Sequence, residues 1–174
     1  MITSFLASAI QQFESSKALG ERCFEQLEES DFHWQYNEES NSIAIIIQHL
    51  HGNMLSRWTD FLTTDGEKES RKRDAEFEVS KMNREALIDL WNEGWYCLLT
   101  TLKSLTETDL LKTIYIRNEA HTVMEAIHRQ LSHYPYHAGQ IVFIAKMLKG
   151  TAWKSLSIPK HASSAFNDQK FGRK

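Results

Sequence analysis

Histidine is unusually frequent in this chain, and two of its histidines are spaced to share one face of a helix. Eight of the 174 residues are histidine. His133 and His137 stand four positions apart in the segment HYPYH, a spacing that places two imidazoles one helical turn apart, where both can bind one metal ion. Two partly exposed histidines on a helix flank would show the same spacing, so the pair alone is a weak indication of a metal site.

A helix pair supplies only two ligands, so a third must come from another part of the chain. The apolar stretch 41–62 offers His49 and His51. His49 shares a polar stripe with Asn53 and Arg57, and such a stripe on a buried helix is typical of an interior site. His51 lies nearer the apolar stripe of the same helix, so helix geometry leaves the choice between the two histidines open.

Amide and guanidinium groups near these histidines are candidates for supporting roles. Gln130 and Gln140 lie one turn from the histidine pair, where they can hydrogen bond to an imidazole. Asn53 is a further candidate for orienting an imidazole, and we expect it and Gln140 near a bound cofactor. Arg57 is a candidate to meet a carboxylate or phosphate group of a ligand, as are two arginines of the charged segment 64–80.

Three neutral imidazoles suit a divalent ion such as Zn, Ni, Co, Cu or Fe. Three protein ligands leave at least one coordination position open for water or substrate, which is typical of catalytic rather than structural sites. Two chemistries follow from an open position. An acidified water can attack an ester or amide, or a thiol whose pKa is lowered can attack an electrophile.

The positions of apolar residues predict four long helices that bring these side chains together. Glycine and proline are scarce, at seven and two residues, which argues against a β-sandwich or barrel. Gly150 follows the last helix as a suitable C-terminal cap, and Pro135 inside that helix is expected to kink it. The sequence therefore predicts an all-α four-helix bundle. The expected helices span residues 3–28, 41–62, 83–105 and 122–149.

The connections differ in composition. Residues 64–80 form a charged linker, which we expect to be a solvated loop long enough to cross over the bundle. Residues 110–117 alternate β-branched side chains and predict a short extended segment before the last helix. We expect one domain over residues 1–153, followed by a basic and partly ordered C-terminal tail, 154–174.

Composition excludes several classes of function. The chain carries 20 basic and 23 acidic residues, for a formal charge of −3, which argues against binding nucleic acid. No apolar run approaches the ~18–20 residues that span a bilayer, which argues against a membrane protein. The two cysteines show no metal-type pairing, and no secretory signal is visible, so we expect a cytoplasmic location.

Three separated blocks of the sequence resemble the DinB/YfiT-like superfamily of bacterial proteins: SIAIIIQHLHGNMLSRWTDFL, DGEKESRKRDAEF and HTVMEAIHRQLSHYPYHAGQIVFIAK. The resemblance runs from Phe5 to about Trp153. It implies a four-helix bundle, commonly a homodimer, whose metal is held by one histidine of the second helix and an H-x-x-x-H pair of the last. These map to His49, His133 and His137, while His51 fills a variable position.

Characterised members of that superfamily are metal-dependent transferases and isomerases that use low-molecular-weight thiols such as bacillithiol or mycothiol. The resemblance therefore implies a metal-dependent thiol transferase, with Zn or Ni as the first expectation for the metal and an anionic thiol and a small electrophile as partners. Two alternatives stay open from the residues themselves. The protein is then either a non-catalytic bundle that binds a metal or a partner, or a metal-dependent hydrolase.

Overall fold

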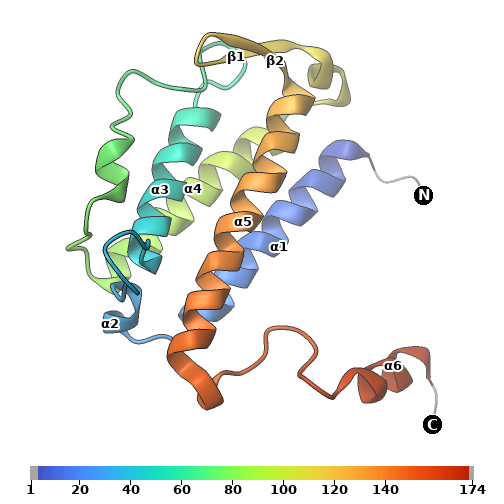
Figure 1. Ribbon diagram of the computed structural model, residues 1–174. Helices are drawn as coiled ribbons and strands as arrows, with labels where there is room; N and C mark the ends of the chain where they lie inside the picture. The colour runs from blue at the N-terminus through green and yellow to red at the C-terminus, as the bar shows by residue number, and fades with distance from the viewer. Residues whose placement is uncertain (1–3, 173–174) are drawn as a thin grey trace.

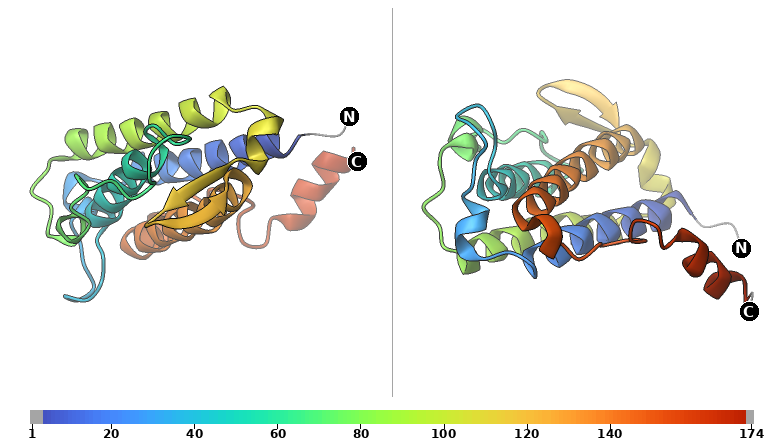
Figure 2. Two further views of the ribbon diagram at one scale, coloured as in Figure 1. Left: turned by 90° about the horizontal axis from the view of Figure 1, so that it is seen from above. Right: turned by 60° about the horizontal axis from the view of Figure 1, so that its bottom comes forward.

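Four long helices lie side by side around a shared core in the computed structural model, which describes residues 4–172 (Figure 1). The protein is mostly helical, with one small two-stranded sheet. Each long helix packs against two others, which gives the order α1, α4, α3, α5 around the core (Figure 2). Their bounds are α1 (Phe5–Phe24), α3 (Ile43–Trp58), α4 (Arg84–Ser104) and α5 (Val123–Lys149).

Side-chain caps fix where three of these helices begin. The Ser42 hydroxyl accepts a hydrogen bond from the third residue of α3, and the Asn83 side chain does the same for α4. At the start of α5, the Glu125 backbone N–H donates to the Thr122 hydroxyl, and the Thr122 backbone N–H donates to the Glu125 carboxylate, so both N–H groups have partners. The predicted helix starts near residues 42, 83 and 122 are therefore confirmed.

The predicted ends are less accurate. The expected first helix, 3–28, is α1 followed by a separate short helix, α2 (Glu29–Phe32), because Glu28 and Asp31 form a capping box that starts a new helix. Residue 3 lies outside the described residues. The expected second helix ends at Trp58 instead of residue 62, and Asp60 follows with a φ of 49° that no α-helix accommodates.

A β-hairpin leads into α5. The predicted extended segment contains a 3-10 helix (Glu107–Leu111) and β1 (Thr113–Ile116), and β1 pairs with a strand that the sequence did not reveal, β2 (Glu119–Thr122). The turn residues Arg117 and Asn118 have φ of 53° and 61°. Their backbone N–H groups donate to the Asp65 carboxylate at 2.8 and 2.7 Å, which attaches the hairpin to the linker.

A buried hydrogen-bond network joins α3 to α5 through the core. The Trp58 indole N–H donates to the Tyr134 hydroxyl at 3.0 Å, and that hydroxyl donates to Asn53 Oδ1 at 3.0 Å. Trp58 and Tyr134 are fully buried, and burial raises the pKa of the Tyr134 hydroxyl, which keeps it a donor. The network fixes the lengthwise register of the two helices that carry the candidate metal ligands.

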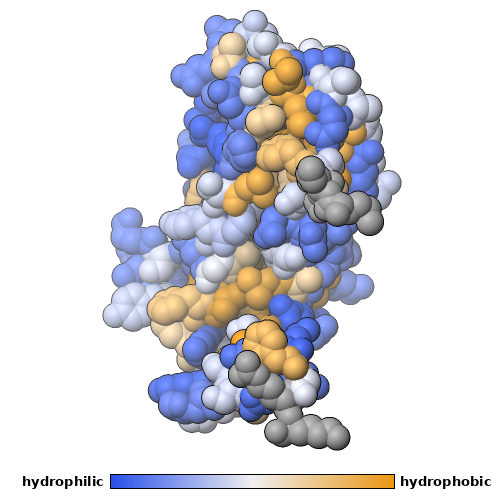
Figure 3. All heavy atoms as spheres, turned by 90° about the vertical axis from the view of Figure 1, so that its right-hand side faces the viewer, coloured by the Kyte–Doolittle hydropathy of each residue, from blue (hydrophilic) through white to orange (hydrophobic). Residues whose placement is uncertain are grey.

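The C-terminal segment is attached to the long helices near its beginning. Trp153 and Leu156 pack against the core, and the Arg22 guanidinium donates to the Leu156 carbonyl at 2.8 Å. Beyond them, α6 (Ser163–Phe171) stands away from the long helices (Figure 2). On the side of the molecule that faces right in Figure 1, hydrophobic residues form a band above the C-terminal end (Figure 3). The division of the chain at residue 153 stays a prediction.

No helix among residues 4–172 combines the length and the apolar character needed to cross a membrane. α5 is the longest of them, and its 27 residues include polar and charged side chains throughout.

α5 also runs without interruption through Pro135, where the proline ring removes one backbone donor.

We expect Tyr134→Phe to lower the free energy of unfolding by about 1–3 kcal/mol, because the change leaves the buried Trp58 donor and the Asn53 acceptor without a partner. Denaturant unfolding followed by circular dichroism measures this. Tyr136→Phe is the matched control, since the Tyr136 side chain on the same helix is 62% exposed. Equal stabilities for the two variants would show that the network does not support the fold.

Candidate metal centre

Three histidines from two helices converge on one point. His49 comes from α3, and His133 and His137 come from α5. The Nε2 atom of His133 lies 3.3 Å from Nε2 of His49 and 3.1 Å from Nε2 of His137. His49 and His137 are buried, and one ring nitrogen of each of the three lies within 4.8 Å of the others. The structure thus brings together the three residues that the sequence predicted as ligands.

The outer nitrogen of each ring faces an oxygen atom that accepts hydrogen bonds. His49 Nδ1 lies 2.9 Å from Glu76 Oε2, and His133 Nδ1 lies 3.1 Å from Gln130 Oε1. His137 Nδ1 lies 2.8 Å from Gln140 Oε1. Because all three partners are acceptors, each Nδ1 carries the proton and each Nε2 presents a lone pair. The two glutamines occupy the supporting positions expected from helical spacing.

The donor set fits a divalent cation. Three lone pairs that face one another repel, and a metal ion at their centre converts the repulsion into coordination. Imidazole nitrogens bound to zinc lie about 2.0–2.1 Å from the ion, so neighbouring ligands of a tetrahedral site are about 3.3 Å apart. The separations of 3.3 and 3.1 Å approach this spacing. These three histidines form a group that can hold a metal ion, although the structure does not identify the metal.

The charged linker supplies the partner of His49, and the expectation of a solvated loop was wrong for the residues that do so, although much of the linker is exposed. The side chains of Arg71 and Glu76 are only 4% and 9% exposed. Arg71 donates to both carboxylate oxygens of Glu76 at 2.7 Å and to Glu67 at 3.0 Å. Gln48 of α3 donates to the Glu76 carbonyl at 3.3 Å. The linker folds onto α3 because a carboxylate turned toward the histidines needs these partners.

Glycine at position 52 makes room for Glu76. A Cβ atom on Gly52 would lie 2.2 Å from Glu76 Oε1 and 2.7 Å from its carboxyl carbon. Gly52 stands in the middle of α3, where glycine costs about 1 kcal/mol relative to alanine. The sequence analysis did not identify Glu76 as part of the site. One signal could have indicated it, namely an unfavourable glycine one turn from His49, which leaves room for the close approach of another group.

Burial and neighbouring charges set the protonation of the site. Burial lowers the pKa of His133 to about 3, with His137, His49 and the arginines nearby adding to the effect. Burial also lowers the pKa of His137, although Gln140 opposes it. Burial alone would raise the pKa of Glu76, but the hydrogen bonds from Arg71 and His49 outweigh it and hold that pKa below its usual range. At neutral pH these groups are in the state that binds a cation.

The structure places the other predicted residues nearby, in different roles. Asn53 accepts the hydrogen bond from Tyr134 and bonds to none of the three imidazoles. Arg57 is 4% exposed and lines a cavity beside the histidines. His51 turns away from them and pairs with Glu93 at 2.9 Å. His121 lies in β2, directly before α5.

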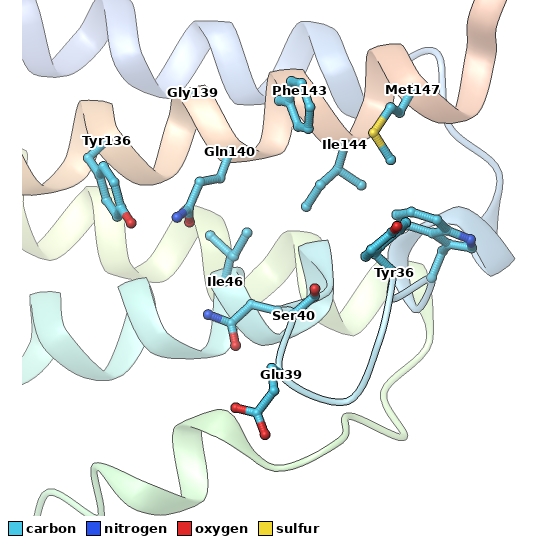
Figure 4. A pocket seen from close by; sticks show the side chains of 12 residues that line it. Tyr36, Glu39, Ser40, Ile46, Tyr136, Gly139, Gln140, Phe143, Ile144 and Met147 are labelled. Atoms are coloured by element: carbon cyan, nitrogen blue, oxygen red, sulfur yellow. The ribbon is translucent and has the colours of Figure 1, made fainter.

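Two hollows adjoin the histidines. One, of about 490 Å³, is lined by His49 and His133 and by several arginines. The other, of about 820 Å³, runs along α5 toward the loop before α3 and has mainly apolar walls (Figure 4). Gln140, which holds His137, lies in the wall of the apolar hollow, and Tyr136 lies in the walls of both. The basic hollow thus opens on two of the histidines, whereas the apolar hollow reaches their neighbours Tyr136 and Gln140.

The sequence matches one family model over residues 1–162, and that family is described as a protein of unknown function (DUF1572). The chain belongs to this family. The DUF1572 match includes the three histidines and the whole linker. No curated protein and no solved structure matches the chain. The DUF1572 family has no assigned function, so the site's chemistry must be inferred from its geometry.

We expect Gly52→Ala to weaken zinc binding by about 10- to 100-fold, because the new methyl group displaces Glu76 from His49. Competition with a chromophoric chelator measures the affinity. Gly139→Ala is the matched control on α5, since its Cβ would meet nothing within 4 Å. Both changes raise helix propensity, so an unchanged affinity in Gly52→Ala would show that Glu76 does not support His49.

We expect the metal-free protein to lose stability as the pH falls from about 6.5 toward 3. In this window the unfolded chain protonates residue 133, whereas the folded protein, with a His133 pKa of about 3, does not. Stability then falls by up to about 1.4 kcal/mol per pH unit for this one proton. Denaturant unfolding in a chelator-containing buffer measures the slope, which should be shallower in His133→Gln. The same slope in both proteins would contradict the assignment.

Proposed function

We propose that this chain is a DinB/YfiT-like four-helix bundle that holds Zn or Ni through His49, His133 and His137 and transfers a low-molecular-weight thiol to an electrophilic small molecule. The observation that supports the proposal is the convergence of three unprotonated Nε2 atoms beside a cavity. Three protein ligands leave a position for a substrate atom on that side.

A divalent ion in such a site lowers the pKa of a thiol at its open position, so that the thiolate is present at neutral pH. The residues of the chain do the remaining work. Glu76, Gln130 and Gln140 hold the imidazoles in one tautomer and orientation, and the basic cavity accommodates an anionic thiol. In the reaction, a bond forms between sulfur and the electrophilic carbon, the bond to the leaving group breaks, and the thiol proton passes to water.

The donor set favours this chemistry over that of iron oxygenases. Those enzymes use two histidines and one carboxylate as ligands. Here the nearest carboxylate, Glu76, faces the outer nitrogen of His49 rather than the point where the Nε2 atoms converge. The apolar hollow along α5 suits the organic part of an electrophile, because it offers aromatic and aliphatic walls next to His137.

The resemblance also supports a homodimer, and we propose that the protein works as one in the cytoplasm. Cys23 and Cys97 are both free thiols, in keeping with a reducing compartment. Sedimentation equilibrium tests the dimer.

We expect about one equivalent of divalent metal in the purified protein and its loss in His49→Ala, because two imidazoles from one helix hold an ion far less tightly than three. Elemental analysis by mass spectrometry measures the content. His51→Ala is the control from the same helix, and it should keep the metal. Retention of metal in His49→Ala would remove the basis of the proposal.

A thiol-conjugation assay then separates the candidate reactions. The metal-loaded protein should consume a model electrophile only when a low-molecular-weight thiol is present, and chelation should abolish the reaction. Turnover of activated esters without a thiol would point to a hydrolase. A full metal complement with no reaction across a broad panel of thiols would favour a non-catalytic binding protein.

A further inference from the structure

The cavity beside the histidines is strongly basic. Among the described residues that line it, five are arginines and one is a glutamate. The arginines come from three separate parts of the chain: α3, the linker with the hairpin turn, and α5. They are Arg57, Arg71, Arg73, Arg117 and Arg129. A cavity with this charge, next to a site for a divalent cation, favours an anionic occupant.

Arg57 is the deepest of these arginines and has no partner. Its side chain is 4% exposed, and it forms no hydrogen bond or ion pair within residues 4–172. Nε and Nη1 are sealed from solvent, which leaves Nη2 as the nitrogen that can reach the cavity. Burial and the charges of Arg129 and Arg71 lower the pKa of Arg57 and Glu67 acts in the opposite direction, but a guanidinium keeps its proton in proteins. A buried cation without a hydrogen-bonded counter-charge is costly.

The nearby carboxylates have other direct partners, although Asp65 and Glu67 act on Arg57 through their charge. Glu76 binds Arg71 and His49, and Glu67 binds Arg71 at 3.0 Å and lies 3.5 Å from Arg117. Arg129, exposed on α5 one turn before His133, forms no ion pair among the described residues. Two guanidinium groups that line the cavity, one buried and one exposed, thus form no ion pair among the described residues.

We propose that Arg57 and Arg129 form a binding site for the oxyanion group, phosphate or carboxylate, of a small-molecule ligand that reacts at the adjacent histidine centre. The role of this ligand as a substrate rests on the proposed function, whereas the anion site itself does not. Guanidinium N–H groups donate strong, charge-assisted hydrogen bonds to both oxyanions. The volume of about 490 Å³ fits a metabolite rather than a macromolecule.

The packing around Arg57 shows that the chain holds this cation in place. A Cβ atom on Gly66 would lie 3.0 Å from Arg57 Cδ and 3.2 Å from Nη1, so glycine leaves the space that the guanidinium fills. The loop at Gly66 is fastened on both sides, because its N–H donates to the Tyr115 carbonyl at 2.8 Å and its carbonyl accepts from Ser56. The cavity wall is therefore formed before any ligand arrives.

Isothermal titration of the metal-free protein with inorganic phosphate at low ionic strength tests the anion site, and a parallel titration with acetate distinguishes the two oxyanions. We expect binding that weakens at least about tenfold in Arg57→Met and in Arg129→Gln. Arg129 is exposed, so its variant folds whatever Arg57→Met does. Arg22→Gln removes an exposed arginine outside the cavity and should leave binding unchanged.

The outcomes separate this proposal from the proposed function. Tighter binding of phosphate or of acetate identifies the oxyanion, and either result supports the site. Binding of neither, or binding that both cavity variants leave intact, overturns it even if the protein holds a metal. Phosphate binding in a protein that holds no metal and turns over no thiol would overturn the proposed function and leave the anion site standing.

Discussion

Three imidazole nitrogens held within 4.8 Å of one another are the constraint on which this structure depends. Such an arrangement is repulsive unless a cation occupies its centre, so the rest of the fold must hold the rings in place. Tyr134 follows His133 directly and donates to Asn53, which lies one turn beyond His49. The core network that joins α3 to α5 therefore also sets the distance between the ligands. Its hydrogen bonds fix the position of α3 along α5 more exactly than apolar packing alone would.

Two residues of the charged linker, Arg71 and Glu76, belong to the site, while about half of the linker is exposed. Arg71 and Glu76 are buried because each satisfies the other, and Glu76 then has one oxygen left to fix the His49 ring. Arg71 thus holds the Glu76 carboxylate, and that carboxylate holds the His49 ring, so the site extends outward beyond its ligands. The same linker binds the hairpin turn through Asp65, so the hairpin, the linker and α3 form a continuous wall of the basic cavity.

Local signals in the sequence predicted what local physics decides. The apolar pattern placed three helix starts near the residues that cap them in the structure, and the spacing of His133 and His137 placed two imidazoles on one face. The choice between His49 and His51 depended on which face of α3 meets α5, a tertiary property that only the resemblance resolved. The burial of the linker and the pairing of β2 depend on partners distant in sequence, and periodicity carries no record of such contacts.

The charges around the centre favour cooperation between its occupants. A divalent ion held by the histidines would share the cavity with Arg57 and Arg129, whose charges oppose it and are only partly offset by Glu67. An oxyanion on these arginines reduces that repulsion, so each occupant strengthens the binding of the other, by the reciprocity that holds for any two coupled sites. A ligand that carries both a thiol and an oxyanion joins the two sites in one molecule. The buried guanidinium, which destabilises the empty protein, then contributes binding free energy to the ligand that neutralises it.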